Sequence, residues 1–122
     1  MQGSDDHEIK LIDSDEKLRQ LCLDLSAIDL IAIDTEFVRT NTFYGRLGLI
    51  QLYDGITCYL IDPVEITDWE LFCQLLEDPN RIAVFHSASE DLNLLQTSLK
   101  MSPGCIFDSQ IAGAFLGIGF SL

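Results

Sequence analysis

Positive charge is scarce in this 122-residue chain, which has 7 lysines and arginines against 20 aspartates and glutamates. Its formal net charge is therefore −13 at neutral pH. A protein that binds nucleic acid unaided normally carries a basic face. The composition argues against such a freestanding binder, but it allows an enzyme that holds phosphate groups through metal ions.

Long hydrophobic runs are also missing. The longest apolar stretches fall far short of the ~20 residues that a membrane-spanning helix needs. The first ten residues are mostly polar and their charged residues are mostly acidic, unlike a signal or transit peptide. We therefore expect a cytoplasmic protein with no membrane partner. The sequence does not reveal the oligomeric state.

The chain has few cysteines, and none of the four forms a C-x-x-C pair. They are Cys22, Cys58, Cys73 and Cys105, each in an apolar segment. We expect reduced, mostly buried thiols and no zinc site. Hydrophobic residues make up 48% of the chain, which is enough for the core of one domain of ordinary size.

The clearest chemical signal lies at the end of an apolar segment, Leu30 to Phe37. Its four uninterrupted apolar residues predict a strand buried on both faces, in the middle of a sheet. Asp34 and Glu36 follow with one residue between them, so their side chains share a face, roughly 7 Å apart. A divalent cation would relieve the repulsion between the two carboxylates. The alternative is an ordinary strand end that emerges into solvent.

The rest of the chain predicts alternating strands and helices. We expect an antiparallel meander of three strands, joined in part by a tight turn at Asp54-Gly55, followed by a parallel strand reached through a helical crossover. The predicted strands are 8–12, 30–37, 47–53, 57–61, 81–85 and 105–107. Helices are predicted after caps at Asp13, at Thr67 or Asp68, at Ser87 or Ser89, and at Asp108. Residues 38–46 are predicted to form a loop.

A third acid of interest, Asp91, lies in the first turn of the helix that follows residue 89. Its i+3 and i+4 neighbours are Leu94 and Leu95, so Asp91 is expected to face inward and Glu90 outward. Favourable interaction with the helix N-terminus is one sufficient explanation of an acid at this position. The other is that Asp91 meets Asp34 and Glu36 at a metal site.

Five segments together resemble the ribonuclease D family of the DEDD 3′–5′ exonuclease superfamily. They are IDTEFVRT from Ile33, LGLIQL from Leu47, LIDP from Leu60, HSASEDL from His86 and FDSQ from Phe107. The resemblance covers nearly the whole chain from about Glu8. It implies an α/β, ribonuclease-H-like mixed sheet flanked by helices and incomplete at its C-terminus. It also implies a catalytic site with two divalent ions, Mg²⁺ or Mn²⁺.

By this resemblance, Asp34, Glu36 and Asp91 are catalytic metal ligands. The family's third motif, a tyrosine paired with a fourth acid, has no counterpart here, and neither has its C-terminal helical nucleic-acid-binding domain. We therefore expect residues 1–122 to be the N-terminal part of an exonuclease domain, inactive or weakly active alone. The expected activity is removal of nucleotides from RNA 3′ ends, with tRNA precursors or other structured RNAs as substrates.

Four further residues are expected to contact substrate: Thr35, Arg39, Tyr44 and His86. For Arg39 and Tyr44, a solvated loop is the alternative; for His86, a structural histidine; and Asp108 is expected to be a helix cap. Two other functions remain open. One is a proofreading-type 3′–5′ deoxyribonuclease with the same acids, and the other is an inactive fragment or scaffold that only binds a partner or nucleic acid.

Overall fold

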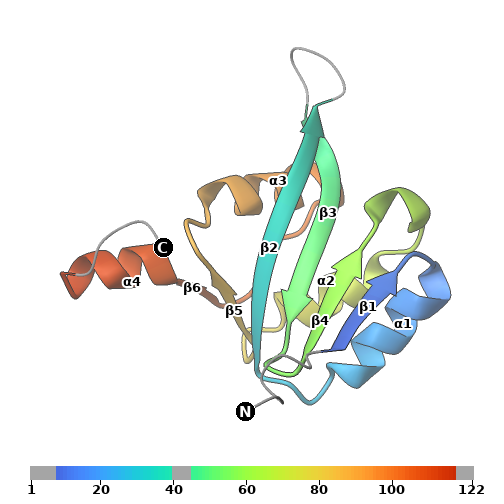
Figure 1. Ribbon diagram of the computed structural model, residues 1–122, viewed down its shortest axis with the longest axis horizontal. Helices are drawn as coiled ribbons and strands as arrows, with labels where there is room; N and C mark the ends of the chain where they lie inside the picture. Colours follow the sequence, from blue (N-terminus) through green and yellow to red (C-terminus); the bar gives the residue numbers. More distant parts are fainter. Residues whose placement is uncertain (1–7, 40–44, 118–122) are drawn as a thin grey trace.

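Six strands form one mixed sheet in the computed structural model (Figure 1), which describes residues 8–39 and 45–117. The strands are β1 (Glu8–Ile12), β2 (Leu30–Arg39), β3 (Gly45–Tyr53), β4 (Thr57–Ile61), β5 (Ile82–Phe85) and β6 (Ile106–Asp108). Their order across the sheet is β1-β4-β3-β2-β5-β6. The α/β mixed sheet predicted from the sequence is confirmed.

The pairing directions match the predicted topology. β2, β3 and β4 form an antiparallel meander, while β1 is parallel to β4 and β6 is parallel to β5. β5 lies parallel to β2, but only over three residue pairs, from Leu30 with Ile82 to Ala32 with Val84. The part of β2 that carries Asp34 and Glu36 therefore extends beyond its pairing with β5.

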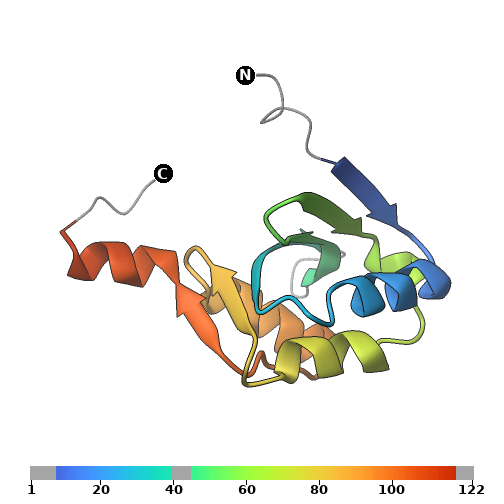
Figure 2. The ribbon, with the colours of Figure 1, turned by 90° about the horizontal axis from the view of Figure 1, so that it is seen from below.

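Three of the helices lie on one side of this sheet, as Figures 1 and 2 show together. The helical segments are α1 (Asp15–Asp24), a 3₁₀ turn at Pro63–Glu65, α2 (Glu70–Glu77), α3 (Ser89–Leu99) and α4 (Ser109–Phe115). α1, α2 and α3 contribute buried apolar side chains to the core. α4 extends away from the sheet (Figures 1 and 2). The core includes Ile31, Ile33, Ile50, Leu52, Ile61 and Phe85 from the strands, with Leu18, Leu21, Phe72, Leu76 and Leu95 from the helices. The expected helices thus flank one face.

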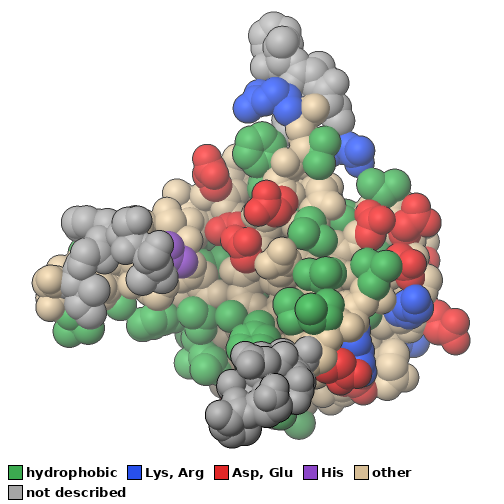
Figure 3. Space-filling view, viewed as in Figure 1, with side chains coloured by type: hydrophobic (Ala, Val, Ile, Leu, Met, Phe, Trp, Pro, Cys, Tyr) green, Lys and Arg blue, Asp and Glu red, His purple; other side chains and the backbone are tan. Residues whose placement is uncertain are grey.

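Among the described residues, no helix covers the opposite face of the sheet, and the side chains there are mixed in character (Figure 3). Acidic side chains gather in the middle of this view, and hydrophobic side chains surround them. Side chains that alternate with the core residues contribute to the exposed apolar surface, among them Leu30, Tyr53 and Ile82. Asp34 and Glu36 are exposed on β2, whereas Ile31 and Ile33 are buried. The predicted alternation along β2 is confirmed, but its burial on both faces is not.

Three local predictions are wrong at element ends. The loop predicted for residues 38–46 is shorter, because β2 continues to Arg39 and β3 begins at Gly45. The α1 cap is Ser14, whose side chain accepts the Lys17 N–H, instead of Asp13. α2 begins after Trp69, so neither Thr67 nor Asp68 occupies the cap position.

The α3 cap differs most from expectation. Residue 88, an alanine, occupies the cap position, and no side chain from the helix's own start caps it. The acceptors for this turn come instead from Asp108, which also caps α4 as predicted. A local sequence pattern cannot reveal an acceptor supplied from about twenty residues away.

Two further predictions concern absences. Within residues 8–39 and 45–117, no helix is long and apolar enough to cross a membrane. All four cysteines are free, although only Cys22 is buried and the other three are half-buried.

Candidate functional site

The position where β2 extends past β5 creates the site. Strand pairing occupies the polar backbone groups of β2 on its β5 side only as far as Ala32. The backbone N–H of Thr35 lies beyond this pairing and donates a hydrogen bond to Asp91 instead. An acid from α3 therefore occupies the place beside β2 that a neighbouring strand would otherwise fill.

Asp91 is held against β2 by two hydrogen bonds to the same oxygen. Its Oδ1 accepts the Thr35 N–H at 3.0 Å and also accepts the Thr35 hydroxyl. The side chain is buried, with 7% of its surface exposed, so the predicted inward orientation is confirmed. Neighbouring Glu90 is exposed, also as predicted. Both hydrogen bonds involve Oδ1, and none found among the described residues involves Oδ2 of Asp91.

Electrostatics links Asp91 to Asp34. Burial is the main cause that raises the pKa of Asp91, and the hydrogen bonds from Thr35 oppose it. The negative charges of Asp34 and Glu90 raise the pKa further. The charge of Asp34 therefore disfavours ionisation of Asp91. A bound cation would relieve this repulsion between the two carboxylates.

The ion pairs found within the described ranges lie away from the three predicted site acids. The ion pairs found there join Lys10 to Glu8, Lys17 to Asp13 and Arg81 to Asp78, so none involves the three predicted site acids. Those same ranges hold no group of three or more histidine, cysteine or acidic residues arranged to hold a metal ion. The structure thus brings Asp91 to Thr35 and near Asp34, while convergence of all three acids stays a prediction.

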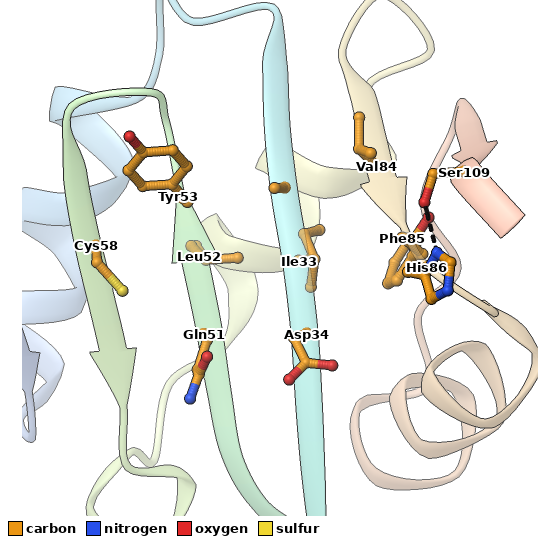
Figure 4. A pocket seen from close by; sticks show the side chains of 11 residues that line it. Ile33, Asp34, Gln51, Leu52, Tyr53, Cys58, Val84, Phe85, His86 and Ser109 are labelled. Carbon is orange, nitrogen blue, oxygen red and sulfur yellow. Dashed lines mark hydrogen bonds between the residues drawn. The ribbon is translucent and has the colours of Figure 1, made fainter. Parts of the chain in front are cut away.

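A cavity of about 390 Å³ opens beside Asp34 (Figure 4). This volume lies in the range of small-ligand sites. β2 and β3 provide Asp34 and Gln51 on one side, and the turn after β5 provides His86 on the other. The remaining lining residues are Ala32, Ile33, Leu52, Tyr53, Cys58, Val84, Phe85 and Ser109. Glu36 and Asp91 are not part of the lining, so the cavity adjoins the acids on one side only.

His86 is oriented by a serine from α4. Its Nδ1 lies 2.9 Å from Oγ of Ser109, whose hydroxyl donates to the carbonyl oxygen of Phe85 at 3.2 Å. One serine hydroxyl thus contacts both the imidazole ring and the backbone just before it. The structure thus shows a positioned imidazole at the cavity edge, and its contact with substrate stays a prediction.

Arg39 is the last residue of β2. The Arg39 guanidinium is 5.5 Å from the centre of the Phe37 ring, a cation–π distance. Arg39 and Arg46 flank the connection between β2 and β3, and Figure 3 shows the basic atoms apart from the central acids. Tyr44 lies outside the described residues.

Sequence reasoning missed the residues that position the site. Thr35 was expected to contact substrate, and the structure shows both of its donors bound to Asp91. Asp108 and Ser109 were not expected to reach the turn before α3, nor Gln51 to lie beside the cavity. The sequence pattern at Asp108 indicated that this residue caps the helix that follows it. It did not indicate the contacts of Asp108 with the turn before α3.

The sequence is similar to those of known exonucleases. Residues 9–122 match the model of a protein family described as 3′–5′ exonuclease. Ribonuclease D of Shewanella sp. is 47% identical over 110 residues, which cover 89% of this chain and 28% of that protein. Ribonuclease D of Musicola paradisiaca is 45% identical over 108 residues, covering 88% and 29%.

Solved structures agree as well. The chain superposes on Escherichia coli RNase D with a TM-score of 0.85 and 44% identity, covering 92% of this chain and 30% of that one. The catalytic core of RRP6 from Trypanosoma brucei gives a TM-score of 0.89 at 26% identity, covering 95% and 33%. The chain spans about three tenths of the length of these relatives. Because the family model matches nearly all of it, the chain belongs to the 3′–5′ exonuclease family.

Proposed function

We propose that this chain provides part of the active site of a metal-dependent 3′–5′ exoribonuclease. The observation that carries the proposal is the placement of Asp91, which is buried, bound to Thr35 between the other two acids, and subject to the charge of Asp34. Such an arrangement is costly for folding alone, since it buries an acid beside a like charge without a basic partner. It is useful where a divalent cation binds.

The donor set fits the metals that the family implies. Asp34, Glu36 and Asp91 offer carboxylate oxygens, the ligand type that Mg²⁺ and Mn²⁺ prefer. We propose that these three residues hold the ions. Bound divalent ions would lower the pKa of an attacking water and stabilise charge on the phosphate and the departing oxygen.

The chain's own residues position this chemistry. Thr35 fixes Oδ1 of Asp91 through two hydrogen bonds, so that rotation of the carboxylate is restricted. β2 holds Asp34 and Glu36 on its open face, where a phosphate can approach. We propose that the tyrosine and fourth acid of the family's third motif come from a segment outside these 122 residues, so the chain alone should turn over weakly.

The proposed substrate is the 3′ end of an RNA, with tRNA precursors or other structured RNAs as the finer proposal. Support comes from relatives called ribonuclease D and from the description of the Escherichia coli structure as an exoribonuclease involved in structured RNA processing. Arg39 would pair with a substrate phosphate, because its guanidinium lies exposed beyond the acids on the same strand. Tyr44 and His86 would contact the sugar or base of the terminal nucleotides.

Activity can be tested without relying on the short chain alone. In Escherichia coli ribonuclease D, the segment that matches this chain would be replaced by it. End-labelled RNA and DNA of the same sequence are then digested with and without Mg²⁺, for the parent chimaera and for Asp34→Asn. The proposal expects Mg²⁺-dependent release of mononucleotides from RNA, at least about a hundredfold slower with Asp34→Asn.

Three outcomes would contradict the proposal. Full activity of Asp34→Asn removes this acid from the site. Equal or faster digestion of DNA favours the deoxyribonuclease alternative. A folded chimaera with no activity in Mg²⁺ or Mn²⁺ favours a binding scaffold. Asp54→Asn is the matched control, because Asp54 lies in the turn between β3 and β4 and its side chain accepts hydrogen bonds from Ile56 and Thr57, at and just after that turn.

A further inference from the structure

Asp108 accepts backbone hydrogen bonds from two separate segments. Its Oδ1 accepts the N–H of Gln110 at 2.9 Å and of Ile111 at 3.4 Å, which caps α4. The same oxygen accepts the Ser87 N–H at 3.0 Å, and Oδ2 accepts the Ala88 N–H at 2.8 Å. One carboxylate therefore joins the start of α4 to the turn that leads into α3.

That turn needs support, because its backbone is unfavourable. Ser87 has a φ of 61°, a left-handed conformation that residues other than glycine rarely adopt. Moreover, α3 has no side-chain cap from its own sequence at Ala88. The N–H groups of this turn would lack partners without Asp108. A residue on β6 therefore supplies what the sequence around the α3 start does not.

A second contact holds the same turn from the same element. Ser109, next to Asp108, bonds both the His86 ring and the Phe85 carbonyl oxygen. The turn from residue 85 to residue 88 is thus fastened on both sides by consecutive residues at the start of α4. The hydrogen bond from Ala88 is the largest of the causes that lower the pKa of Asp108, so its carboxylate is ionised at neutral pH.

The turn is connected directly to the acid site. Asp91 lies three residues after Ala88, in the first turn of α3, and its position depends on where that helix begins. We propose that Asp108 is a positioning residue of this site: by holding the Ser87–Ala88 turn, it sets where Asp91 meets Thr35. The proposal rests on the proposed function only for the use made of Asp91, because the Asp91–Thr35 contact is a feature of the fold itself.

One substitution separates this role from simple capping of α4. In Asp108→Asn, the amide oxygen can take the place of Oδ1 and keep the bonds to Gln110, Ile111 and Ser87. The amide nitrogen then replaces Oδ2 and faces the Ala88 N–H, donor against donor. The variant therefore retains the α4 cap while it loses one of the two bonds to the turn.

The readout is hydrogen exchange of the Thr35 amide, measured by NMR on the whole 122-residue chain without metal or RNA. The proposal expects Asp108→Asn to raise this exchange rate about tenfold, relative to core amides of β3. Asp91→Ala gives the rate for a Thr35 amide without its acceptor. Asp54→Asn is the matched control, since Oδ1 of Asp54 likewise accepts two backbone N–H groups, and it should leave Thr35 unchanged.

An unchanged Thr35 rate in folded Asp108→Asn would overturn the proposal and leave Asp108 as a cap of α4 only. Because glycine adopts positive φ readily, adding Ser87→Gly to Asp108→Asn should lower the Thr35 exchange rate about threefold, toward that of the parent. If Asp108→Asn alone does not fold, the double variant is compared with Ser87→Gly. A rise of about threefold is then expected, and no rise contradicts the proposal.

Failure of the proposed function has a different signature. In the chimaera with Escherichia coli ribonuclease D, Asp108→Asn should lower kcat more than it changes KM for RNA, because the proposed role of Asp91 is at the reacting phosphate and not along the rest of the RNA. A chimaera without nuclease activity leaves the exchange result intact. A normal kcat of Asp108→Asn together with fast Thr35 exchange would show that the Asp91–Thr35 contact is not needed for the reaction.

Discussion

Asp91 and Thr35, which are 56 positions apart, are joined by two hydrogen bonds to a single carboxylate oxygen. The backbone bond takes the place of strand pairing that ends at Ala32, and the hydroxyl bond restricts rotation of the acid. As a result, an acid from α3 lies beside the strand that carries Asp34 and Glu36. This relationship leads to predictions about charge, metal binding and stability.

Replacing Asp91 by asparagine should change how stability depends on pH. Burial raises the native pKa of Asp91 above its unfolded value of ~3.9, so the native state binds more protons just above that pH. Stability from this group is therefore present below ~4 and is lost as pH rises through the native pKa. In EDTA, Asp91→Asn should gain stability relative to the parent as pH rises above ~4, where the parent loses this contribution.

Denaturant unfolding at several pH values measures this difference. Asp108→Asn provides a control of opposite sign, since hydrogen bonds, first from Ala88, lower the native pKa of Asp108. Its lost stability should be greatest above ~pH 4, where the parent carboxylate is ionised. Parallel pH curves for the parent and Asp91→Asn would show that Asp91 is not destabilised by its surroundings.

Divalent metal should stabilise the parent chain and not the Asp34→Asn variant. A ligand that binds only the folded state raises its stability by about 2.7 kcal/mol when present at about 100 times Kd. Thermal melts in Mn²⁺ and in EDTA should therefore separate for the parent. In EDTA, Asp34→Asn should melt at or above the parent temperature, because repulsion with Asp91 and Glu36 is removed.

The control for metal binding is Asp54→Asn, which removes one negative charge away from the site. It should retain the full Mn²⁺ shift. Equal shifts for the parent, Asp34→Asn and Asp54→Asn would mean that Mn²⁺ binds the acidic surface without a defined site.

A buried arginine should be essential to stability. Arg81 is 6% exposed and donates to the carbonyl oxygens of Ile28, Leu75 and Ser26 at 2.7, 2.6 and 2.9 Å. These bonds come from three different nitrogens of the planar guanidinium, and lysine has a single nitrogen that cannot replace them all. Arg81→Lys should therefore lower the free energy of unfolding by about 2–4 kcal/mol. Lys17→Met, at an exposed ion pair, should change it by less than about 1 kcal/mol. Similar effects of the two substitutions would contradict this account.

Gly48 should tolerate alanine only if its neighbour is made smaller. The strand register shifts between Glu36 and Phe37, and a Cβ at Gly48 would lie 2.4 Å from Cγ2 of Val38. Gly48→Ala should destabilise the chain by about 1–3 kcal/mol, and Val38→Ala in the same chain should recover part of that loss. Chemical unfolding of the single and double variants checks this coupling. Additive effects would mean that the predicted clash is absent.

The fold could largely be predicted from the sequence, because its signals are local. Buried strands, the turn at Asp54-Gly55 and the crossover to β5 all follow from hydrophobic patterns and turn residues. The helix starts could not be predicted as well. The α3 start depends on Asp108, which lies far along the chain, and a local cap pattern at Ser87 or Ser89 suggested the wrong residue.

The candidate site shows the same division. Asp34, Glu36 and Asp91 could be selected from their spacing and from the family resemblance, and the inward orientation of Asp91 followed from helical periodicity. The sequence led to the prediction that these acids meet, but it could not give the distances between them, because those depend on how far β5 pairs with β2. The role of Thr35 as the donor to Asp91 is also a tertiary property, since its backbone N–H becomes available only where that pairing ends.

The central claim is that the three acids share a bound divalent ion. A crystal of the chain soaked in Mn²⁺, with data collected for anomalous scattering, tests it most directly. The account predicts an anomalous peak about 2.0–2.6 Å from carboxylate oxygens of Asp34, Glu36 and Asp91. Peaks confined to other acidic residues would contradict it. So would the absence of a peak at this site together with carboxylates of these three residues more than about 10 Å apart.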